Sequence, residues 1–384
     1  MTVAQREELL NLAFRPHYPI EDPDSFFGRE MEAARVVQAL HSPGQHVVIY
    51  GERGAGKTSL ARVSTIGHAR IDVFCESESS FSKIARDVVL KCQADASSKI
   101  VYDAATNKVS INGVMRSLDE LDGNSLKALL PAKRLVLVFD EVDRLPASTI
   151  ADLGEFTKNV ATDLPQVTLI FVGVGATVSE LLRGHESVFR NIRSVGLGKF
   201  DQDATIQAIL DKGGKTLGLE FSAESVSSIV SASDRYPYYV QLLGITSARL
   251  AMIDGATAVT QQHVTSGAES AAQDADESLR DAYEAAILSS RSDVYRFVLW
   301  GLANLDNRVE GSVGQIAEVA SRYASLALSP QVVGAALNKL ALDVRGGIVA
   351  KRVMGPKKTF YSFNHPLMRG FVRLRVINAS KNGA

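Results

Sequence analysis

Residues 51–58 have the types and spacing of a phosphate-binding loop, because Gly-Glu-Arg-Gly-Ala-Gly-Lys-Thr fits the pattern G-x-x-x-x-G-K-[ST]. An apolar run at 46–50 precedes it and a helix-like run at 59–63 follows it, so strand, loop and helix come in the required order. We expect Lys57 to reach the β- and γ-phosphates of a nucleotide and Thr58 to offer its hydroxyl to Mg²⁺. The expected nucleotide-binding residues of the loop are Gly51, Glu52, Arg53, Gly54, Ala55, Gly56, Lys57, Thr58 and Ser59. The alternative is a glycine-rich turn that happens to precede a lysine.

A second motif lies about eighty residues further on, where the apolar run 135–139 ends in Asp140-Glu141. Such a run is typical of a central parallel strand that is buried on both faces. Asp140 is placed to hold Mg²⁺, and Glu141 to orient and deprotonate an attacking water molecule. The alternative is a pair of solvated carboxylates at the end of a strand.

The two adjacent acids favour hydrolysis over kinase chemistry, because kinases usually lack the second carboxylate. The guanine-specific signature Asn-Lys-x-Asp is absent from the sequence. We therefore expect ATP, with Mg²⁺, as the nucleotide.

These motifs lie within a predicted α/β core, a P-loop NTPase fold whose parallel sheet is covered by helices on both faces. The predicted strands are 46–50, 71–75, 135–139, 167–172 and 194–197. The predicted helices are 30–40, 80–92, 149–162 and the short 179–183. Residues 95–125 are polar, and we expect an excursion with a small hairpin at Asn107 or Asn112-Gly113.

Two helical regions follow the core. Helices over 204–212, 223–231, 236–253 and 260–278, without an intervening strand, predict an all-α lid. Three further helices, 294–304, 313–320 and 329–343, are followed by strands 348–353 and 359–363, an order that describes a winged helix-turn-helix domain. In such a domain the third helix enters the major groove of DNA and the hairpin tip contacts phosphates.

The charge is unevenly distributed along the chain. The net charge is −1, yet residues 291–384 hold 14 Lys and Arg against 5 Asp and Glu, and no acid follows Arg345. This basic end favours a DNA surface, and the hairpin cations expected to contact DNA are Lys351, Arg352, Lys357 and Lys358. A winged helix that binds a protein remains the alternative, since the third helix offers only Gln331, Asn338 and Lys339 as base readers.

The composition is that of an ordinary globular protein, with 46% apolar and 22% charged residues. No apolar stretch reaches the length of a membrane span, and the first ten residues include Arg6, Glu7 and Glu8 where a signal peptide would be apolar. We expect a cytoplasmic protein without membrane contact. Cys75 and Cys92 have no metal-ligand spacing and are expected to be reduced core thiols.

Several segments together resemble AAA+ ATPases of the origin-recognition and initiator type (Orc/Cdc6-like) and the related STAND-like ATPases. They are Phe27-Gly28-Arg29-Glu30, the loop 51–58, Asp140-Glu141, His185-x-Ser187-x-x-Arg190, Tyr236-Pro237-Tyr238-Tyr239 and Gln241-Leu242-Leu243-Gly244. The resemblance runs from about Phe14 to the C-terminus. It implies that Ile20 and Phe27 flank the adenine and that the lid around Pro237 closes over the nucleotide. It also implies that Arg190, or failing that Arg193, is an arginine finger that acts on a neighbouring subunit, in a homo-oligomer or with a partner protein.

The resulting domain prediction is an N-terminal arm at 1–28, an ATPase core at 29–200, a helical lid at 201–275 and a winged helix at 276–384. Two departures from the family pattern lead us to expect slow hydrolysis. The polar residue that senses the γ-phosphate is missing after strand 167–172, where Thr177 is a weak substitute, and Arg235 stands where many relatives have glycine. Arg235 is expected either to act as a second sensor or to pair with Asp234.

The sequence therefore predicts an ATP-binding switch that couples nucleotide state to DNA binding. Two alternatives remain open. One is a STAND-like signalling or defence ATPase whose winged helix binds a protein, and the other is a transposition or partition regulator that forms a filament on DNA.

Overall fold

The computed structural model of the chain describes residues 2–93, 100–131, 133–174, 190–274, 277–288, 293–305, 310–324, 326–355, 358–365 and 367–381. The fold divides into two compact units. The core unit consists of residues 19–198, and the helical unit consists of residues 1–18 together with residues 199–384.

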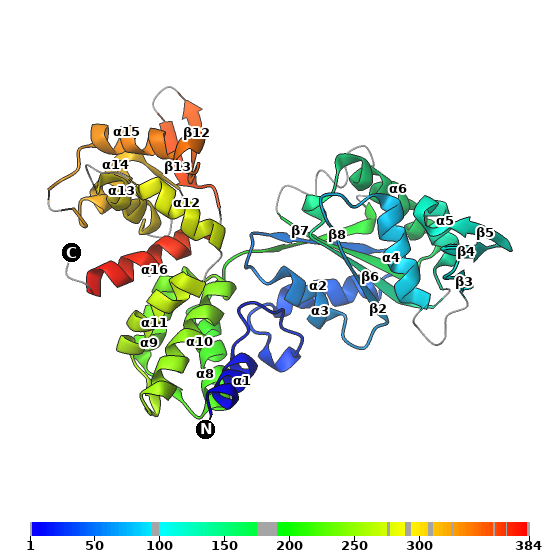
Figure 1. Cartoon of the computed structure of the whole chain (residues 1–384), viewed down its shortest axis with the longest axis horizontal. Coiled ribbons are helices and arrows are strands. Elements are labelled where there is room, and N and C mark those ends of the chain that lie inside the picture. Colours follow the sequence, from blue (N-terminus) through cyan, green and yellow to red (C-terminus); the bar gives the residue numbers. More distant parts are fainter. Residues whose placement is uncertain are drawn as a thin grey trace. The chain divides into compact units, whose positions relative to one another are not determined.

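The core unit is built on a five-stranded parallel sheet in the order β2-β6-β7-β1-β8 (Figure 1). Its strands are β1 (His46–Gly51), β2 (Arg70–Phe74), β6 (Leu135–Asp140), β7 (Val167–Gly173) and β8 (Ile192–Leu197). The three inner strands carry the continuous apolar runs that predicted them, because helices cover both faces of the sheet. This confirms the predicted parallel sheet, while the predicted short helix at 179–183 lies outside the described residues.

Alternation along the strands divides the core into two layers. In β6, Val136 and Val138 face one buried cluster, while Leu137 and Phe139 face the other. The helices on the first face are α2 (Glu30–Leu40) and α3 (Lys57–Ser64), and those on the second are α4 (Phe81–Gln93), α5 (Gly123–Leu129) and α6 (Ala147–Asp163) (Figure 1). The short 3-10 helices of the unit are η1 (Pro23–Ser25), η2 (Leu118–Glu120) and η3 (Val142–Arg144).

The predicted excursion between α4 and β6 is a small antiparallel sheet of β3 (Tyr102–Asp103), β4 (Lys108–Ile111) and β5 (Val114–Ser117). Both turns proposed from the sequence are present, with Asn107, Asn112 and Gly113 at positive φ. The excursion therefore consists of two consecutive hairpins that share β4, and not of a single hairpin.

The helical unit begins with α1 (Val3–Ala13), a helix that the sequence analysis did not predict. It packs on α8 and α10, and Glu7 forms an ion pair with Arg249 of α10. Phe14 is fully buried, and a Cβ at Gly213 or Gly244 would come within 2.2 or 2.6 Å of its ring atoms. The absence of a side chain at these two glycines therefore leaves room for the Phe14 ring, which packs the N-terminal segment against the lid helices.

The lid helices are α8 (Asp203–Leu217), α9 (Ala223–Ser233), α10 (Pro237–Ile253) and α11 (Gln261–Asp274). The sequence predicted no strand between them, but β9 (Glu220–Phe221) and β10 (Ala258–Val259) form a short parallel pair. Two residues per strand are too few to give a recognisable period-2 pattern.

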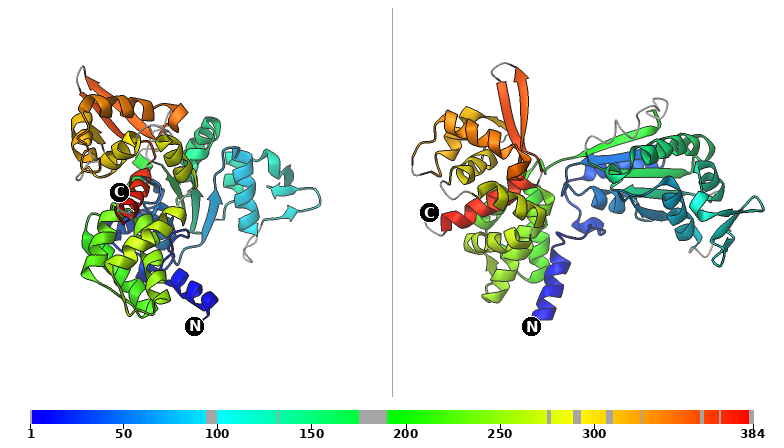
Figure 2. Two further views of the ribbon diagram at one scale, coloured as in Figure 1. Left: turned by 60° about the vertical axis from the view of Figure 1, so that its left-hand side comes forward. Right: turned by 45° about the horizontal axis from the view of Figure 1, so that its top comes forward.

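The C-terminal part contains α12 (Glu277–Ile287), α13 (Val294–Ala303), α14 (Val313–Ala320) and α15 (Pro330–Leu340), with η5 (Asp343–Arg345). Its sheet has the order β11-β13-β12, where β11 is Glu310–Ser312, β12 is Val349–Gly355 and β13 is Lys358–Phe363. In both views of Figure 2 the β12–β13 hairpin extends beyond these helices. The three predicted helices and the two predicted hairpin strands are present in the predicted order, and β11 is an additional strand.

The chain ends in α16 (Met368–Lys381), which the sequence analysis also missed. This helix contacts α9 and α11 of the lid as well as α13. Within the described residues no helix is both long and apolar enough to cross a membrane. Cys75 and Cys92 are both buried, and neither forms a disulfide bond.

Candidate nucleotide-binding site

The loop between β1 and α3 has the geometry that a phosphate-binding loop needs. At Gly51, where φ is +155°, a Cβ would come within 2.2 Å of the Leu197 carbonyl oxygen, so the close approach of β8 requires glycine. Gly56 precedes α3 in a left-handed conformation with φ of +88°. The first N–H groups of α3 have no acceptor within the helix, and they lie at its positive end. An anion is therefore favoured at this loop.

Lys57, the first residue of α3, folds back over the loop. Its Nζ donates hydrogen bonds to the carbonyl oxygens of Gly51 (3.0 Å) and Glu52 (2.9 Å). Burial lowers the pKa of Lys57, and the carboxylates of Asp143 and Asp140 oppose that effect. A phosphate group would likewise favour the charged ammonium, so the residue fits its predicted role.

Thr58 and Asp140 meet at the carboxyl end of β6. Thr58 Oγ1 donates a 2.8 Å hydrogen bond to Asp140 Oδ2, and the Glu141 N–H donates one of 2.9 Å to Asp140 Oδ1. Burial raises the pKa of Asp140, and the hydrogen bond from Thr58 opposes the rise. A hydroxyl and a buried carboxylate this close together are oxygen ligands of the kind Mg²⁺ prefers, so the pair fits the predicted metal site.

Glu141 follows β6 in a left-handed conformation, with φ of +58°. Non-glycine residues rarely adopt this conformation, and strained backbone of this kind clusters at active sites and switch regions. The Glu141 Oε2 atom lies 2.9 Å from Arg144 Nε, and both side chains are about half exposed. The predicted general base is therefore held in an ion pair.

The sequence analysis did not single out Asp143. Its Oδ1 accepts a 2.9 Å hydrogen bond from the Val174 N–H, directly after β7. A Cβ at Gly173 would come within 3.0 Å of the same oxygen, so glycine at the end of β7 allows the contact. Asp143 thus joins the end of β7 to the segment after β6, close enough to Lys57 to affect its pKa. The sequence signal that could have identified Asp143 is its position three residues after Asp140.

Comparisons with known proteins agree with this geometry. Residues 25–171 match the sequence profile of the AAA ATPase domain family. No curated protein sequence matches the chain at a significant level.

Solved structures share the fold over nearly the whole chain. The Walker-type ATPase of Pyrococcus abyssi is 16% identical with a TM-score of 0.55, covering 95% of this chain and 99% of its own. The Orc2 protein of Aeropyrum pernix, in ADPNP–ADP complexes, is 14% identical with a TM-score of 0.52 and coverages of 97% and 98%. The Orc1 protein of the same organism, in complex with DNA, is 17% identical with a TM-score of 0.50 and coverages of 95% and 96%. These likenesses show the fold alone, and they confirm the predicted fold class, a P-loop NTPase core whose parallel sheet is covered by helices.

Two contacts hold the arm near Ile20 against α3 of the core unit. The N–H of Ile20 donates to Ser59 Oγ of α3 (3.0 Å), and Glu21 pairs with Arg62 of the same helix (2.6 Å). Ile20 and Phe27 are both half-buried. Pro237 begins α10 in the helical unit.

Arg190 is exposed and lies two residues before the start of β8. Strands β1 and β8 are parallel, with His46 opposite Ile192 and Gly51 opposite Leu197. At about 3.3 Å per residue, Arg190 lies about 20 Å from the strand ends that carry the phosphate loop. Within the core unit it is therefore far from Lys57, as an arginine that serves another subunit must be. Arg193, its fallback, is half-buried within β8, and Thr177 lies outside the described residues.

Arg235 does not pair with Asp234, which was one of its two predicted roles. Its Nε lies 2.6 Å from Asp203 Oδ1, while Asp234 binds other cations. Asp234 and Arg235 both have a left-handed backbone conformation, and their side chains have different neighbours. The two side chains therefore do not pair with each other.

Lys351 and Arg352, two of the four cations predicted to contact DNA, have partners within the C-terminal part. Lys351 Nζ donates to Asn338 Oδ1 (2.8 Å), which also accepts from Tyr361 (3.2 Å), and Arg352 pairs with Glu310. One predicted base reader, Asn338, is thus held by the hairpin, although its side chain remains exposed. Lys357 and the side chain of Lys358 lie outside the described part of the structure.

Proposed function

We propose that the protein is an AAA+ switch that binds ATP with Mg²⁺ and hydrolyses it slowly. The observation that carries the proposal is the juxtaposition of Lys57 on the loop carbonyls with Thr58 on Asp140. In the bound state, the Lys57 ammonium leaves those carbonyls for the β- and γ-phosphate oxygens. Thr58 and Asp140 hold Mg²⁺, which neutralises charge on the phosphates.

Glu141 is the proposed general base for the attacking water. It must first leave Arg144, and this supports slow turnover. Asp143 keeps the end of β7 beside the site through the Val174 N–H. Ile20, Phe27 and the lid segment at Pro237 are the proposed adenine neighbours.

The ATP proposal is tested by Lys57→Ala, with nucleotide affinity measured by calorimetry. The variant should keep its fold but lose ATP binding, because it lacks the ammonium group proposed to bind the β- and γ-phosphates. Lys83→Ala is the matched control, since Lys83 forms only an exposed pair with Glu76 of the same unit. Unchanged ATP affinity in a folded Lys57→Ala protein would refute the proposed function.

We further propose that the C-terminal part, residues 276–384, is a winged helix that contacts DNA, and that the lid at 201–275 links it to the nucleotide state of the core. The proposal is supported by the basic C-terminal end, by the projecting hairpin with Lys351 and Arg352, and by the fold shared with an Orc1 protein solved with DNA. Since Asn338 is held within the domain, we expect phosphate contacts to outweigh base reading.

DNA binding is tested by measuring affinity against salt concentration. Replacing Lys357 and Lys358 with Glu should weaken binding to any sequence and lower the salt slope by about one per lost contact. ATP affinity should stay unchanged. Replacing Lys212 and Lys215, exposed lysines of α8, is the matched control.

A protein partner is the second candidate for this surface, and one observation favours it. Val353 and Met354 near the hairpin tip are 65% and 60% exposed. Apolar side chains at such a tip suit a protein interface of a signalling ATPase. If wild type binds no DNA at low salt with ATP and Mg²⁺ present, this function replaces the DNA proposal.

A further inference from the structure

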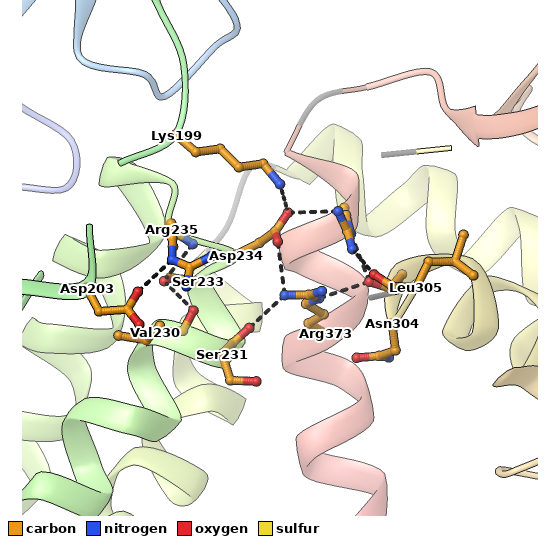
Figure 3. A network of polar contacts seen from close by, with 12 residues as sticks. Lys199, Asp203, Val230, Ser231, Ser233, Asp234, Arg235, Asn304, Leu305 and Arg373 are labelled. Atoms are coloured by element: carbon orange, nitrogen blue, oxygen red, sulfur yellow. Dashed lines mark hydrogen bonds and ion pairs between the residues drawn. The ribbon is translucent and has the colours of Figure 1, made fainter. Parts of the chain in front are cut away.

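One carboxylate, that of Asp234, whose side chain is 12% exposed, joins three parts of the helical unit (Figure 3). Its Oδ2 atom accepts a hydrogen bond from Lys199 Nζ and lies 3.4 Å from Arg369 Nη1, while its Oδ1 lies 3.1 Å from Arg373 Nη1. Lys199 directly follows the core unit, and the two arginines belong to α16. We call Lys199, Asp234, Arg369 and Arg373 the Asp234 cluster.

Asp234 occupies a position that is unfavourable by itself. It follows the last residue of α9 with φ of +51°, and Arg235 continues with φ of +60°. Consecutive left-handed non-glycine residues are strained, and such strain persists only where the surroundings over-determine it. A carboxylate at the negative end of a helix is also disfavoured. The three cations compensate for both effects.

The two arginines also hold the ends of helices. Arg369 donates to the carbonyl oxygens of Ala303 (2.9 Å) and Leu305 (2.5 Å). Arg373 donates to Ala303 (2.9 Å) and to Ser231 (2.8 Å). These carbonyls lie at the C-terminal ends of α13 and α9, where cations are stabilising. The same guanidinium groups therefore bind the C-terminal part, the lid and Asp234.

The strained turn is tied to the chain that enters from the core. The Phe200 N–H donates to the Arg235 carbonyl oxygen (3.0 Å), and Lys199 binds Asp234. On the core side, the carbonyl of Gly198 accepts from the guanidinium of Arg29, which is buried. Pro237, the proposed nucleotide-closing residue, begins α10 two residues after the turn.

We propose that Asp234 is a positioning residue. Through its ion pairs with Lys199 and with Arg369 and Arg373 of α16, it fixes the conformation of the 234–235 turn and so the position of Pro237. The proposal deepens the ATP switch and rests on it for the role of Pro237. Loss of the carboxylate charge frees Lys199, Arg369 and Arg373 together. The C-terminal part of the protein thereby regulates closure of the lid over the nucleotide.

Hydrogen–deuterium exchange without nucleotide tests the cluster itself. In Asp234→Asn, whose amide tolerates the left-handed conformation, exchange should increase in 199–205, in 234–241 and in 368–376. Arg373→Gln, which leaves two cations in place, should give the same pattern more weakly. Arg375→Gln is the matched control on α16, because Arg375 faces Glu284 at 3.9 Å. A change confined to the segment that carries each substitution would overturn the proposal.

Steady-state kinetics test the link to the nucleotide. Asp234→Asn should raise KM for ATP about fivefold or more, in the range of coupling between sites, with kcat nearly unchanged. Asp234→Glu, which keeps the charge, should restore much of the affinity. An unchanged KM together with altered exchange would refute the nucleotide role. If wild type itself binds no ATP, the proposed function fails, and exchange still decides whether Asp234 joins the three segments.

Discussion

Thr58 donates a 2.8 Å hydrogen bond from Oγ1 to Oδ2 of Asp140, a residue 82 positions further along the chain. The bond joins the start of α3 to the carboxyl end of β6, so the two proposed Mg²⁺ ligands are in contact with each other. The Thr58 hydroxyl also stabilises the charged form of a carboxylate whose pKa is raised by burial. The fold therefore brings these two side chains together.

Thr58→Ala should separate the two roles of this hydroxyl. It leaves the Asp140 carboxylate buried with one hydrogen bond fewer, at a cost of about 1–3 kcal/mol. The stimulation of ATP binding by Mg²⁺ should be lost, whereas Thr58→Ser should retain it. Titrations of ATP affinity against Mg²⁺ measure both, and equal stimulation in wild type and Thr58→Ala would exclude Thr58 as a ligand.

Substitutions at Glu141 and at Arg144 should change kcat in opposite directions. Glu141→Gln should bind ATP but lose about 10²–10⁴-fold in kcat, because an amide cannot accept the proton of water. Arg144→Ala frees the base from an exposed pair of about 0.2–1 kcal/mol, so kcat should rise by up to about fivefold. Phosphate release under saturating ATP measures both. Turnover of Glu141→Gln equal to that of wild type would place the base elsewhere.

Arg190→Ala should bind ATP normally and lose about 10³-fold or more in hydrolysis, as for other arginine fingers. Wild-type activity per molecule should rise with protein concentration, because Arg190 serves a neighbour. Mixing Arg190→Ala with Lys57→Ala should restore activity, since each supplies the part that the other lacks. Arg193→Ala tests the fallback candidate in the same assay, because only the arginine that acts as the finger should show this loss. Activity that is flat with concentration, with no recovery on mixing, would contradict a shared site.

His46 predicts a loss of core stability at mildly acid pH. Its ring is fully buried in β1 and accepts a 3.1 Å hydrogen bond from the Leu169 N–H at Nδ1. Burial lowers the pKa of His46 from 6.5 to about 4, so the fold prefers the neutral ring. The contribution of the neutral His46 ring to the free energy of unfolding is fully present above pH 6.5. It is lost as the pH falls toward 4, and the total loss is about 3 kcal/mol.

Thermal unfolding between pH 7.5 and pH 5 measures this effect. Wild type should lose more stability than His46→Asn, whose amide oxygen keeps an acceptor near the Nδ1 position but does not titrate. The difference between the two proteins isolates His46 from the carboxylates, which titrate in both. Identical slopes would show that His46 does not govern the acid limit.

The sequence by itself determined the parallel core and the composition of the phosphate site. The loop 51–58 and the run 135–139 are local patterns, and the strands β1 and β6 that flank them follow from their apolar periodicity alone. Helix α2 occupies the predicted residues 30–40 for the same reason. Parallel strands place their carboxyl ends at one edge of a sheet, so Thr58 and Asp140 could be expected to meet.

The tertiary structure alone decided the contacts between distant segments. Arg235 bonds to Asp203, and Asp234 bonds to cations that lie 35 or more positions away, so no spacing in the sequence relates them. The first residues join the lid because glycines at 213 and 244 leave room for Phe14. Local periodicity fixes an element and the face it buries, but the topology of the folded chain chooses each ion-pair partner.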